Sequence, residues 1–464
     1  MSPHEAAFSG SAVPAQTLAS HSWSASEQKS ATDRFVEFVR FETVSTLAPD
    51  TGAYRSCAAW LVDLCRNVGR EDGGTAVLDE VFLLPEAPAH SPVVVAIWKG
   101  RDEGLPVLVL NSHYDVVPAD TSAWTVPPFA GLQRDGNIYG RGTQDMKCVC
   151  IQYVEAIRRI HRLDPTWQPE RSIYLTFVPD EEVGGFGMAA FLESETYRSL
   201  PGIALALDEG LASTTDTYSV FYGERLPWWV DVTAHGPTGH GSRFIENTAV
   251  EQLVELANKA LAFRDGQRAQ LGLDEHVNCA HAVAAKTLGD VTSLNITTLQ
   301  AGVRVGETFA YNCVPPKAQC SLDIRISPHV EPSEIGEMLD QWCRECSKDE
   351  KNKVEWSFLG NGNDMKKHSV TSTDPNQNPW YAVFSKAMAD MNLKFEPQVF
   401  PAATDSRFLR ALGIRALGFS PMKQTEIMLH ENDEYIPESI FLEGIDVYVG
   451  LIRSLGGIGK DVDA

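Results

Sequence analysis

The stretch "RSIYLTFVPDEEVGG" (residues 171–185) joins a run of apolar, β-forming residues to three consecutive acids and two glycines. The apolar residues are continuous rather than alternating, which is typical of a strand buried on both faces. Neighbouring side chains on an extended strand point to opposite faces, so Glu181 and Glu182 can serve one site only where the strand has ended. The stretch therefore predicts a central strand whose carboxyl end delivers two glutamates.

Three further runs have the same buried-strand character, and a long helical pattern separates the second from the stretch above. The strand-like runs are "PVVVAIWKG" (92–100), "PVLVLNSHYDVVP" (106–118) and "GIALALDEG" (202–210), and the helical pattern is "DMKCVCIQYVEAIRRIHRL" (145–163). Strands that alternate with helices predict an α/β fold with a largely parallel sheet sandwiched by helices.

The pattern changes after residue 222, where alternating strands and two helices indicate a smaller α+β unit. Its strands are expected in 227–236, 292–302 and 318–328, and residues 264–290 are expected to form a long loop. The α/β pattern of buried strands and helices returns after residue 362, so one α/β domain is interrupted by an insertion. The predicted division is a disordered tail over 1–28, a catalytic domain over 29–223 and 362–464, and an inserted lid and dimerisation domain over 224–361.

Composition excludes several classes of partner. The chain of 464 residues has 39 basic and 62 acidic residues, a formal net charge of −23, which argues against nucleic-acid and anionic-membrane partners. No apolar run is long enough for a membrane span, and the Ser- and Ala-rich start lacks the features of a secretory signal. Nine scattered cysteines indicate reduced thiols, so a cytoplasmic protein is expected.

Metal-ligand residue types stand at the ends of these strands. Ligands of open α/β sheets gather beyond the carboxyl ends of the strands, so these side chains are expected at one edge. Each alone has a plainer interpretation, such as a core histidine, a helix N-cap or a solvated turn. Together they would repel one another unless cations neutralised them, and imidazole with carboxylate suits Zn²⁺ best. The residues are His113, Asp115, Asp145, Glu181, Glu182, Asp208, Glu209 and His430.

Six motifs in order resemble those of one family of enzymes. They are "SHYDVVP", "GRGTQDMKCV", "PDEEVGG", "ALDEG", "GHGSRF" and "LHENDE". The series is similar to that of the di-zinc amidohydrolases that include the aminoacylases, carboxypeptidase G and succinyl-diaminopimelate desuccinylase, and it is most similar to the aminoacylases. The resemblance implies two Zn²⁺ ions per subunit. It implies that Asp145 bridges them, with His113 and Glu209 on one ion and Glu182 and His430 on the other.

The same resemblance implies roles for residues around the metals. Glu181 would be the general base that takes a proton from the metal-bridging water, and Asp115 would orient the ring of His113. His240 would stand over the oxyanion, often from the partner subunit; His235 lies nearby, but the motif favours His240. Taken alone, His240 is equally well explained as part of a surface turn.

The substrate carboxylate needs a cation, and the planar fork of arginine suits it best. The resemblance places Asn312 and Arg325 on the lid and Arg407 near the pocket, while Arg410 is a further candidate. Each of these arginines is also a candidate for a structural salt bridge, so the assignment among them stays open.

Together these features predict a zinc-dependent amidohydrolase that hydrolyses N-acyl-L-amino acids and works as a homodimer through the inserted domain. Within the same superfamily, a di-zinc dipeptidase or carboxypeptidase is the alternative. A binding protein that has lost catalysis is a third interpretation, which would require the loss of a ligand or of Glu181, and all of these residues are present.

Overall fold

The computed structural model describes residues 23–71, 73–272, 286–359 and 367–463, which form two compact units. The first unit comprises the described residues up to Tyr222, Thr371–Pro397 and those from Thr404 onward. The second comprises Gly223–Val370 and Gln398–Ala403. The lid and dimerisation roles expected of the insertion stay predictions. No helix in these described ranges is long and apolar enough to cross a membrane.

The amino-terminal helix begins earlier than expected. Residues 1–22 of the predicted tail lie outside the described residues, but α2 spans Ala25–Val39, so the prediction was wrong for residues 25–28. Ser24 is the N-cap: its hydroxyl oxygen accepts from the amide of Glu27, while the Glu27 carboxylate accepts from the Ser24 amide. This reciprocal capping box satisfies two amide donors that helix ends otherwise leave unpaired.

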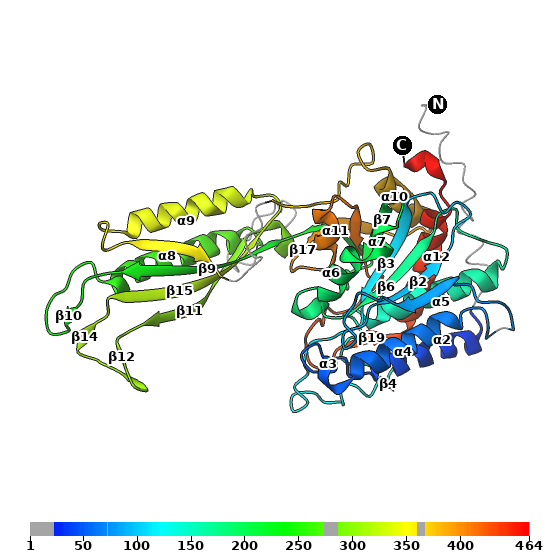
Figure 1. Cartoon of the computed structure of the whole chain (residues 1–464), viewed down its shortest axis with the longest axis horizontal. Helices are drawn as coiled ribbons and strands as arrows, with labels where there is room; N and C mark the ends of the chain where they lie inside the picture. Colours follow the sequence, from blue (N-terminus) through cyan, green and yellow to red (C-terminus); the bar gives the residue numbers. More distant parts are fainter. Residues whose placement is uncertain (1–22, 72, 273–285, 360–366, 464) are drawn as a thin grey trace. The chain divides into compact units, whose positions relative to one another are not determined.

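A mixed eight-stranded sheet forms the centre of the first unit, in the order β1-β2-β6-β3-β7-β18-β8-β17 (Figure 1). The pairs β6–β3, β3–β7 and β7–β18 are parallel, which confirms the predicted largely parallel centre. The outer pairs β1–β2, β2–β6 and β18–β8 are antiparallel. The strands are β1 Glu80–Leu83, β2 Val94–Trp98, β3 Val107–His113, β6 Ile173–Val178, β7 Ile203–Asp208, β8 Tyr218–Glu224, β17 Phe395–Phe400 and β18 Ala416–Gly418.

Helices cover both faces of this sheet. Alternate residues of β3 divide between two cores: Leu108 and Leu110 belong to one, whereas Val107 and Val109 belong to the other. The larger core takes side chains from α2, α4 Ala53–Arg66, α5 Lys147–Leu163, α10 Pro379–Asp390 and α12 Glu438–Gly456. The smaller takes them from α6 Phe186–Glu193 and α11 Ser406–Ala411. Burial on both faces explains the continuous apolar runs in the sequence.

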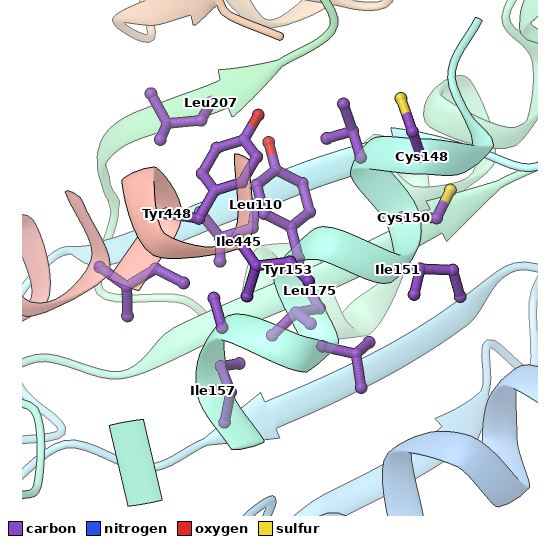
Figure 2. Close-up of a cluster of buried hydrophobic side chains, with 14 of the residues drawn as sticks. Leu110, Cys148, Cys150, Ile151, Tyr153, Ile157, Leu175, Leu207, Ile445 and Tyr448 are labelled. Carbon is purple, nitrogen blue, oxygen red and sulfur yellow. The ribbon is translucent and has the colours of Figure 1, made fainter. Parts of the chain in front are cut away.

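Helix α5 is enclosed between the sheet and α12. Figure 2 shows Tyr153 and Ile157 of α5 with Leu110, Leu175 and Leu207 of the sheet and with Ile445 and Tyr448 of α12. The rings of Tyr153 and Tyr448 lie 4.6 Å apart between centroids. Each fully buried apolar side chain of this size contributes about 1.5–3 kcal/mol, so α5 is fixed firmly against strands β3, β6 and β7.

The remaining elements of the first unit are short. A three-stranded sheet in the order β19-β5-β4 joins Tyr435–Pro437, Asn137–Tyr139 and Leu132–Arg134, and it pairs the segment before α5 with the segment before α12. The other short elements are α3 Ala48–Thr51, η1 Glu181–Val183, α7 Glu195–Arg198 and η3 Lys460–Val462.

The second unit is an antiparallel sheet with two helices on one face, as its alternating sequence predicts. The order is β11-β15-β9-β16, and alternate residues of β9 and β15 pack against α8 and α9. Helix α8 continues into the expected loop as far as Ala269, and residues 273–285 lie outside the described residues. The elements are β9 Leu226–His235, β10 Gly239–His240, α8 Ala249–Ala269, η2 Leu288–Asp290, β11 Ser293–Ala301, β12 Arg304–Val305, β13 Thr308–Phe309, β14 Cys313–Val314, β15 Lys317–Ile326, α9 Pro332–Cys346 and β16 Val354–Phe358.

Candidate metal centre

The parallel strands of the first unit bring the expected ligands to one edge of the sheet. His113 is the last residue of β3 and pairs in register with Val178, the last residue of β6. Glu209 follows directly after β7, the other neighbour of β3. The carboxyl ends of three adjacent strands therefore deliver side chains to one place, as the fold class requires.

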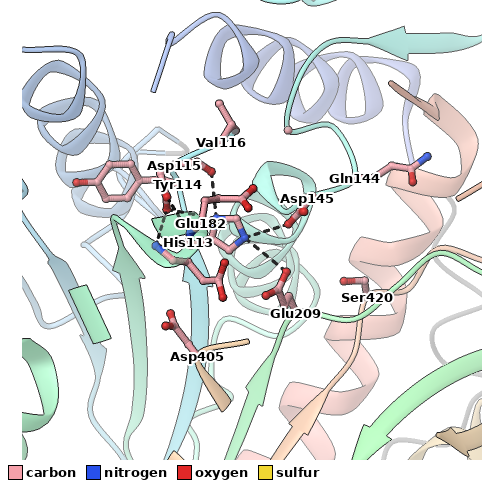
Figure 3. Close-up of polar contacts among 12 residues, drawn as sticks. His113, Tyr114, Asp115, Val116, Gln144, Asp145, Glu182, Glu209, Asp405 and Ser420 are labelled. Atoms are coloured by element: carbon pink, nitrogen blue, oxygen red, sulfur yellow. Dashed lines mark hydrogen bonds and ion pairs between the residues drawn. The ribbon is translucent and has the colours of Figure 1, made fainter. Parts of the chain in front are cut away.

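One group of candidate ligands contains His113, Asp145 and Glu209 (Figure 3). The Nε2 atom of His113 lies 3.0 Å from Oδ1 of Asp145 and 3.5 Å from Oε2 of Glu209. All three side chains are buried. One imidazole and two carboxylates thus converge on a single point.

A second group contains Asp145, Glu182 and His430. Here Nε2 of His430 lies 3.3 Å from Oδ2 of Asp145 and 3.2 Å from Oε2 of Glu182. Asp145 belongs to both groups and turns a different oxygen toward each histidine. The pairing of β5 with β19 helps to bring the Asp145 and His430 segments together.

The two glutamates lie on a sharp turn after β6. The backbone is left-handed at Asp180 and has positive φ at Gly184 and Gly185, with the single turn of η1 between them. A Cβ atom on Gly185 would fall 2.3 Å from Cε2 of Phe408, so this position requires glycine. The strand has ended before the glutamates, which lets Glu181 and Glu182 serve one site.

Asp115 ties this turn to the histidine. Its Oδ1 accepts the amide hydrogen of Glu181 and its Oδ2 that of Glu182, both at 3.2 Å, and the hydroxyl of Ser45 donates to Oδ2 at 2.9 Å. The Nδ1 atom of His113 lies 3.0 Å from the Asp115 carbonyl oxygen and 3.4 Å from its Oδ1. A hydrogen bond from Nδ1 leaves Nε2 free to face the candidate metal position.

Asp145 does not act as the N-cap that its place before α5 suggested. The N-cap is Met146, and no side chain caps this helix. The loop is instead held by Glu434, which sequence reasoning missed. The Glu434 carboxylate accepts the amide hydrogens of Gly142 and Gln144 at 3.0 and 2.7 Å and pairs with Arg141 at 2.9 Å. Its position in "LHENDE", four residues after His430, was the available signal.

The electrostatics of the metal-free cluster reflect its burial. Burial, with the charge of Asp145, raises the pKa of Glu182 to about 7 and raises that of Glu209 well above its usual range. Hydrogen bonds to Asp145 and Glu182 raise the pKa of His430 to about 10. Burial opposes a similar rise at His113, but its hydrogen bonds to Asp115 and Asp145 outweigh that effect and raise its pKa. Because metal ligands must be deprotonated, groups with raised pKa values would release protons when a cation binds.

Glu181 differs from the other acids of the cluster. Its side chain is buried, and its Oε1 has no hydrogen-bond partner among the residues that the structure describes. Burial and the nearby charge of Glu209 raise its pKa well above the usual value. A buried carboxyl group with an unoccupied oxygen is suited to receive a proton from a bound reactant.

The donor set fits divalent metal ions. Each group offers one imidazole nitrogen and two carboxylate oxygens, with the atoms within 4.8 Å of one another, and described cysteines belong to neither group. The buried carboxylates of Asp145, Glu181 and Glu209 lie close together and are costly without neutralising cations. Imidazole and carboxylate ligands with a shared carboxylate favour Zn²⁺ and a two-ion arrangement.

Two other predicted site residues lie together in the second unit. The β10–β14 pairing places His240 opposite Cys313, and the Asn312 carbonyl accepts the amide hydrogen of Gly241 at 2.7 Å. The Nδ1 atom of His240 accepts from the amide of Ser242 at 3.2 Å. Because a backbone amide can only donate, a neutral His240 carries its proton on Nε2, which has no hydrogen-bond acceptor among the residues that the structure describes.

The candidate arginines have different environments. Arg325, on β15 in the second unit, forms a two-point ion pair with Asp323 at 2.7 and 3.0 Å. Arg407, on α11 in the first unit, lies over the ring of Phe408, 4.6 Å from its centroid. Arg410 is buried and donates to the carbonyls of Ala416 and Phe221, so its role is structural.

The sequence matches characterised proteins over most of its length. It is 44% identical over 370 residues to aminoacylase-1 of Dictyostelium discoideum, covering 79% of this chain and 86% of that protein. It is 40% identical over 430 residues to aminoacylase-1 of Homo sapiens, covering 91% of this chain and 95% of the human protein.

Solved structures share the fold at low sequence identity. Human carnosine dipeptidase 1 matches with a TM-score of 0.62 and 16% identity, covering 95% of this chain and 98% of that one. An M20 family metallo-carboxypeptidase from Sulfolobus solfataricus matches with a TM-score of 0.61 and 17% identity, covering 92% and 99%. The model of Peptidase family M20/M25/M40 matches residues 109–454. This chain therefore belongs to peptidase family M20/M25/M40 and is a relative of the aminoacylase-1 proteins.

Proposed function

We propose that the protein is a zinc-dependent aminoacylase that holds two Zn²⁺ ions per subunit and hydrolyses N-acyl-L-amino acids to a carboxylate and a free L-amino acid. Membership of a metal-dependent hydrolase family and the identity of 40–44% to aminoacylase-1 proteins support the reaction class. The observation that carries the proposal is the shared carboxylate of Asp145, which faces His113 and His430 with separate oxygens.

The ligand sets follow from the two groups. His113 and Glu209 would hold one ion, Glu182 and His430 the other, and Asp145 would bridge both. When bound, the ions lower the pKa of water toward neutrality and polarise the amide carbonyl. The protein's part is to fix the ligands, and it does so through Asp115 on one side and Glu434 on the other.

Glu181 would be the general base. Its unpartnered Oε1 takes the proton of the attacking water and then delivers it to the amide nitrogen, which leaves as the amine of the product. The carbonyl carbon meanwhile becomes tetrahedral, and its oxygen gains negative charge. Because Nδ1 of His240 already accepts from Ser242, the Nε2–H donor suits that oxyanion.

We further infer that the active enzyme is a cytoplasmic homodimer formed through the inserted domain, with His240 supplied by the partner subunit. The substrate is a small molecule whose carboxylate would be bound by Asn312 and Arg325 of the lid and by Arg407. In that state Arg325 would exchange its ion pair with Asp323 for the substrate. A planar guanidinium matches a carboxylate with two parallel hydrogen bonds.

Turnover of N-acetyl-L-methionine tests the proposed reaction. The protein as purified is assayed, then stripped with a chelator, and finally reloaded with Zn²⁺ while bound metal is counted. We expect turnover to disappear with the metal and to return as the content approaches two ions per subunit. Full activity in the stripped protein would contradict the proposal.

A panel of dipeptides, assayed beside the N-acyl amino acids, separates the aminoacylase from a di-zinc dipeptidase or carboxypeptidase. The kcat/KM should be higher for N-acyl-L-amino acids than for dipeptides with the same carboxyl-terminal residue. The reverse order would favour the peptidase alternative. A protein that binds two ions but hydrolyses neither class would be the non-catalytic binding protein.

A further inference from the structure

A buried polar network lies next to the metal centre and is not used by the mechanism above. Its centre is Asn111 of β3, whose amide nitrogen donates to Oδ1 of Asp208 at 2.9 Å and to Oδ2 of Asp405 at 3.3 Å. The Asn111 amide oxygen accepts from the hydroxyl of Thr176 at 2.7 Å, and the hydroxyl of Ser406 donates to Oδ2 of Asp208 at 2.7 Å. Asn111 thus uses both of its amide hydrogens and its oxygen inside the protein.

The network connects the strand ends that carry two metal ligands. Asn111 precedes His113 by two residues on β3, so both side chains leave the same face of that strand. Asp208 ends β7 and directly precedes Glu209. The hydrogen bond between Asn111 and Asp208 therefore crosses from β3 to β7 two residues before His113 and one residue before Glu209.

This buried polar network reduces the stability of the fold, so core packing alone does not explain its presence. Asn111, Asp208, Asp405 and Ser406 are each at most 1% exposed. Oδ1 of Asp405 has no partner among the described residues, and burial, with the nearby charge of Asp208, raises the pKa of Asp405 to about 7. Figure 3 shows Asp405 beside the cluster that contains His113 and Glu209. Buried polar groups that are incompletely paired reduce stability, so a positional role explains them better than packing does.

We propose that Asn111 is a positioning residue for one half of the metal centre: it fixes the separation of His113 and Glu209 by holding the end of β3 to the end of β7. The inference rests on the proposed two-ion site. It gives no role to Asn111 at Glu182 and His430. The hydrogen bond from Thr176 reaches β6 six residues before Glu182, and His430 comes from the segment before α12. Its distinctive consequence is that loss of the Asn111 hydrogen bonds should weaken Zn²⁺ binding at one ion position and not at the other.

The test separates the two positions by removing one histidine at a time. In His430→Ala protein, the position built from His113, Asp145 and Glu209 remains, and in His113→Ala protein the other remains. Asn111→Leu, which keeps the number and branching of the side-chain heavy atoms and removes all three hydrogen bonds, is added to each. The Kd for Zn²⁺ is measured by competition with a chromophoric chelator, and circular dichroism checks the fold.

Asn111→Leu should raise the Kd about 10- to 100-fold in the His430→Ala protein, the usual range for residues that support a ligand, and leave it within about threefold in the His113→Ala protein. Ser112→Ala is the matched control, because Ser112 is equally buried on β3 but leaves its opposite face. It should change neither Kd by more than about twofold, since it lacks the bond to β7.

Equal changes in both backgrounds, or no change in the His430→Ala background, would overturn the inference. If Asn111→Leu does not fold, Ser406→Ala is judged by the same criterion, because it removes one hydrogen bond to Asp208 and opens little space. A selective rise in Kd supports the positioning role, and an unselective rise or none rejects it. Wild-type protein that bound no divalent metal would instead refute the proposed function itself.

Discussion

Asp145 faces two histidines with separate oxygens: Oδ1 lies 3.0 Å from Nε2 of His113, and Oδ2 lies 3.3 Å from Nε2 of His430. An amide in its place keeps one oxygen and replaces the other with a donor that cannot ligate a metal. We therefore expect Asp145→Asn to reduce bound Zn²⁺ from two ions to one or none per subunit. Metal analysis after gel filtration measures this, and an unchanged content of two would exclude the bridging role.

Glu181 and Glu182 allow a matched pair of substitutions on adjacent residues. Glu181→Gln should retain two Zn²⁺ ions and lower kcat about 10²- to 10⁴-fold, because only the proton acceptor is removed. Glu182→Gln should instead lower the metal content, since its Oε2 lies 3.2 Å from Nε2 of His430. Bound zinc and kcat are measured on both proteins. Loss of metal from Glu181→Gln, or near wild-type kcat, would contradict the assignment.

The sequence predicted the strand ends well because continuous apolar runs report burial on both faces. It placed His113 and Glu209 at strand ends along one edge of a largely parallel sheet, and the structure has them at the ends of the adjacent strands β3 and β7. It did not predict Glu434, because hydrogen bonds to the amides of a loop some 290 residues earlier leave no periodic pattern. The start of α2 was missed for another reason: the apolar face of the helix begins several residues after the Ser24 cap.

Substitution of Glu434 tests whether its hydrogen bonds hold the loop that carries the proposed bridging carboxylate of Asp145. Glu434→Gln puts an amide donor against the amide hydrogens of Gly142 and Gln144, which leaves a buried donor unpaired. We expect weaker Zn²⁺ binding by about 10- to 100-fold, as for other residues that orient a ligand. Glu431→Gln, an exposed neighbour in the same segment, is the control and should leave the Kd unchanged. Equal changes of the Kd for Zn²⁺ in the two variants would contradict this role of Glu434.

The metal-free cluster predicts a pH dependence of stability. The folded-state pKa of Glu182 is raised from 4.5 to about 7, so its contribution is present below pH 4.5 and is lost as the pH rises through 7. His430, raised from 6.5 to about 10, acts with the same sign between pH 6.5 and 10. Metal-free protein should therefore lose stability between pH 5 and 8, while bound metal replaces these protons.

The difference in Tm between metal-loaded and metal-free protein should accordingly widen with pH, by roughly 1–2 °C for each kcal/mol that the metal-free protein loses. Thermal melts at pH 5, 6, 7 and 8 with and without a chelator measure the difference. Metal-free Glu182→Gln protein should show a smaller loss between pH 5 and 7, because the amide does not titrate. A difference that narrowed as the pH rose would contradict the assignment of these groups.

The origin of the oxyanion donor can be decided by complementation. Glu181→Gln lacks the base and His240→Ala lacks the donor, so each pure protein should be nearly inactive. In a mixed dimer, a His240→Ala subunit keeps its Glu181 and would receive the intact His240 of the other subunit. If His240 acts across the dimer, random exchange of subunits restores roughly a quarter of wild-type activity, because half of the dimers are mixed and each has one complete site. If His240 acts within its own subunit, every site in the mixture lacks one group and no activity returns. Gel filtration of the mixture establishes that dimers have formed, so recovery supports the partner's role and its absence in mixed dimers rejects it.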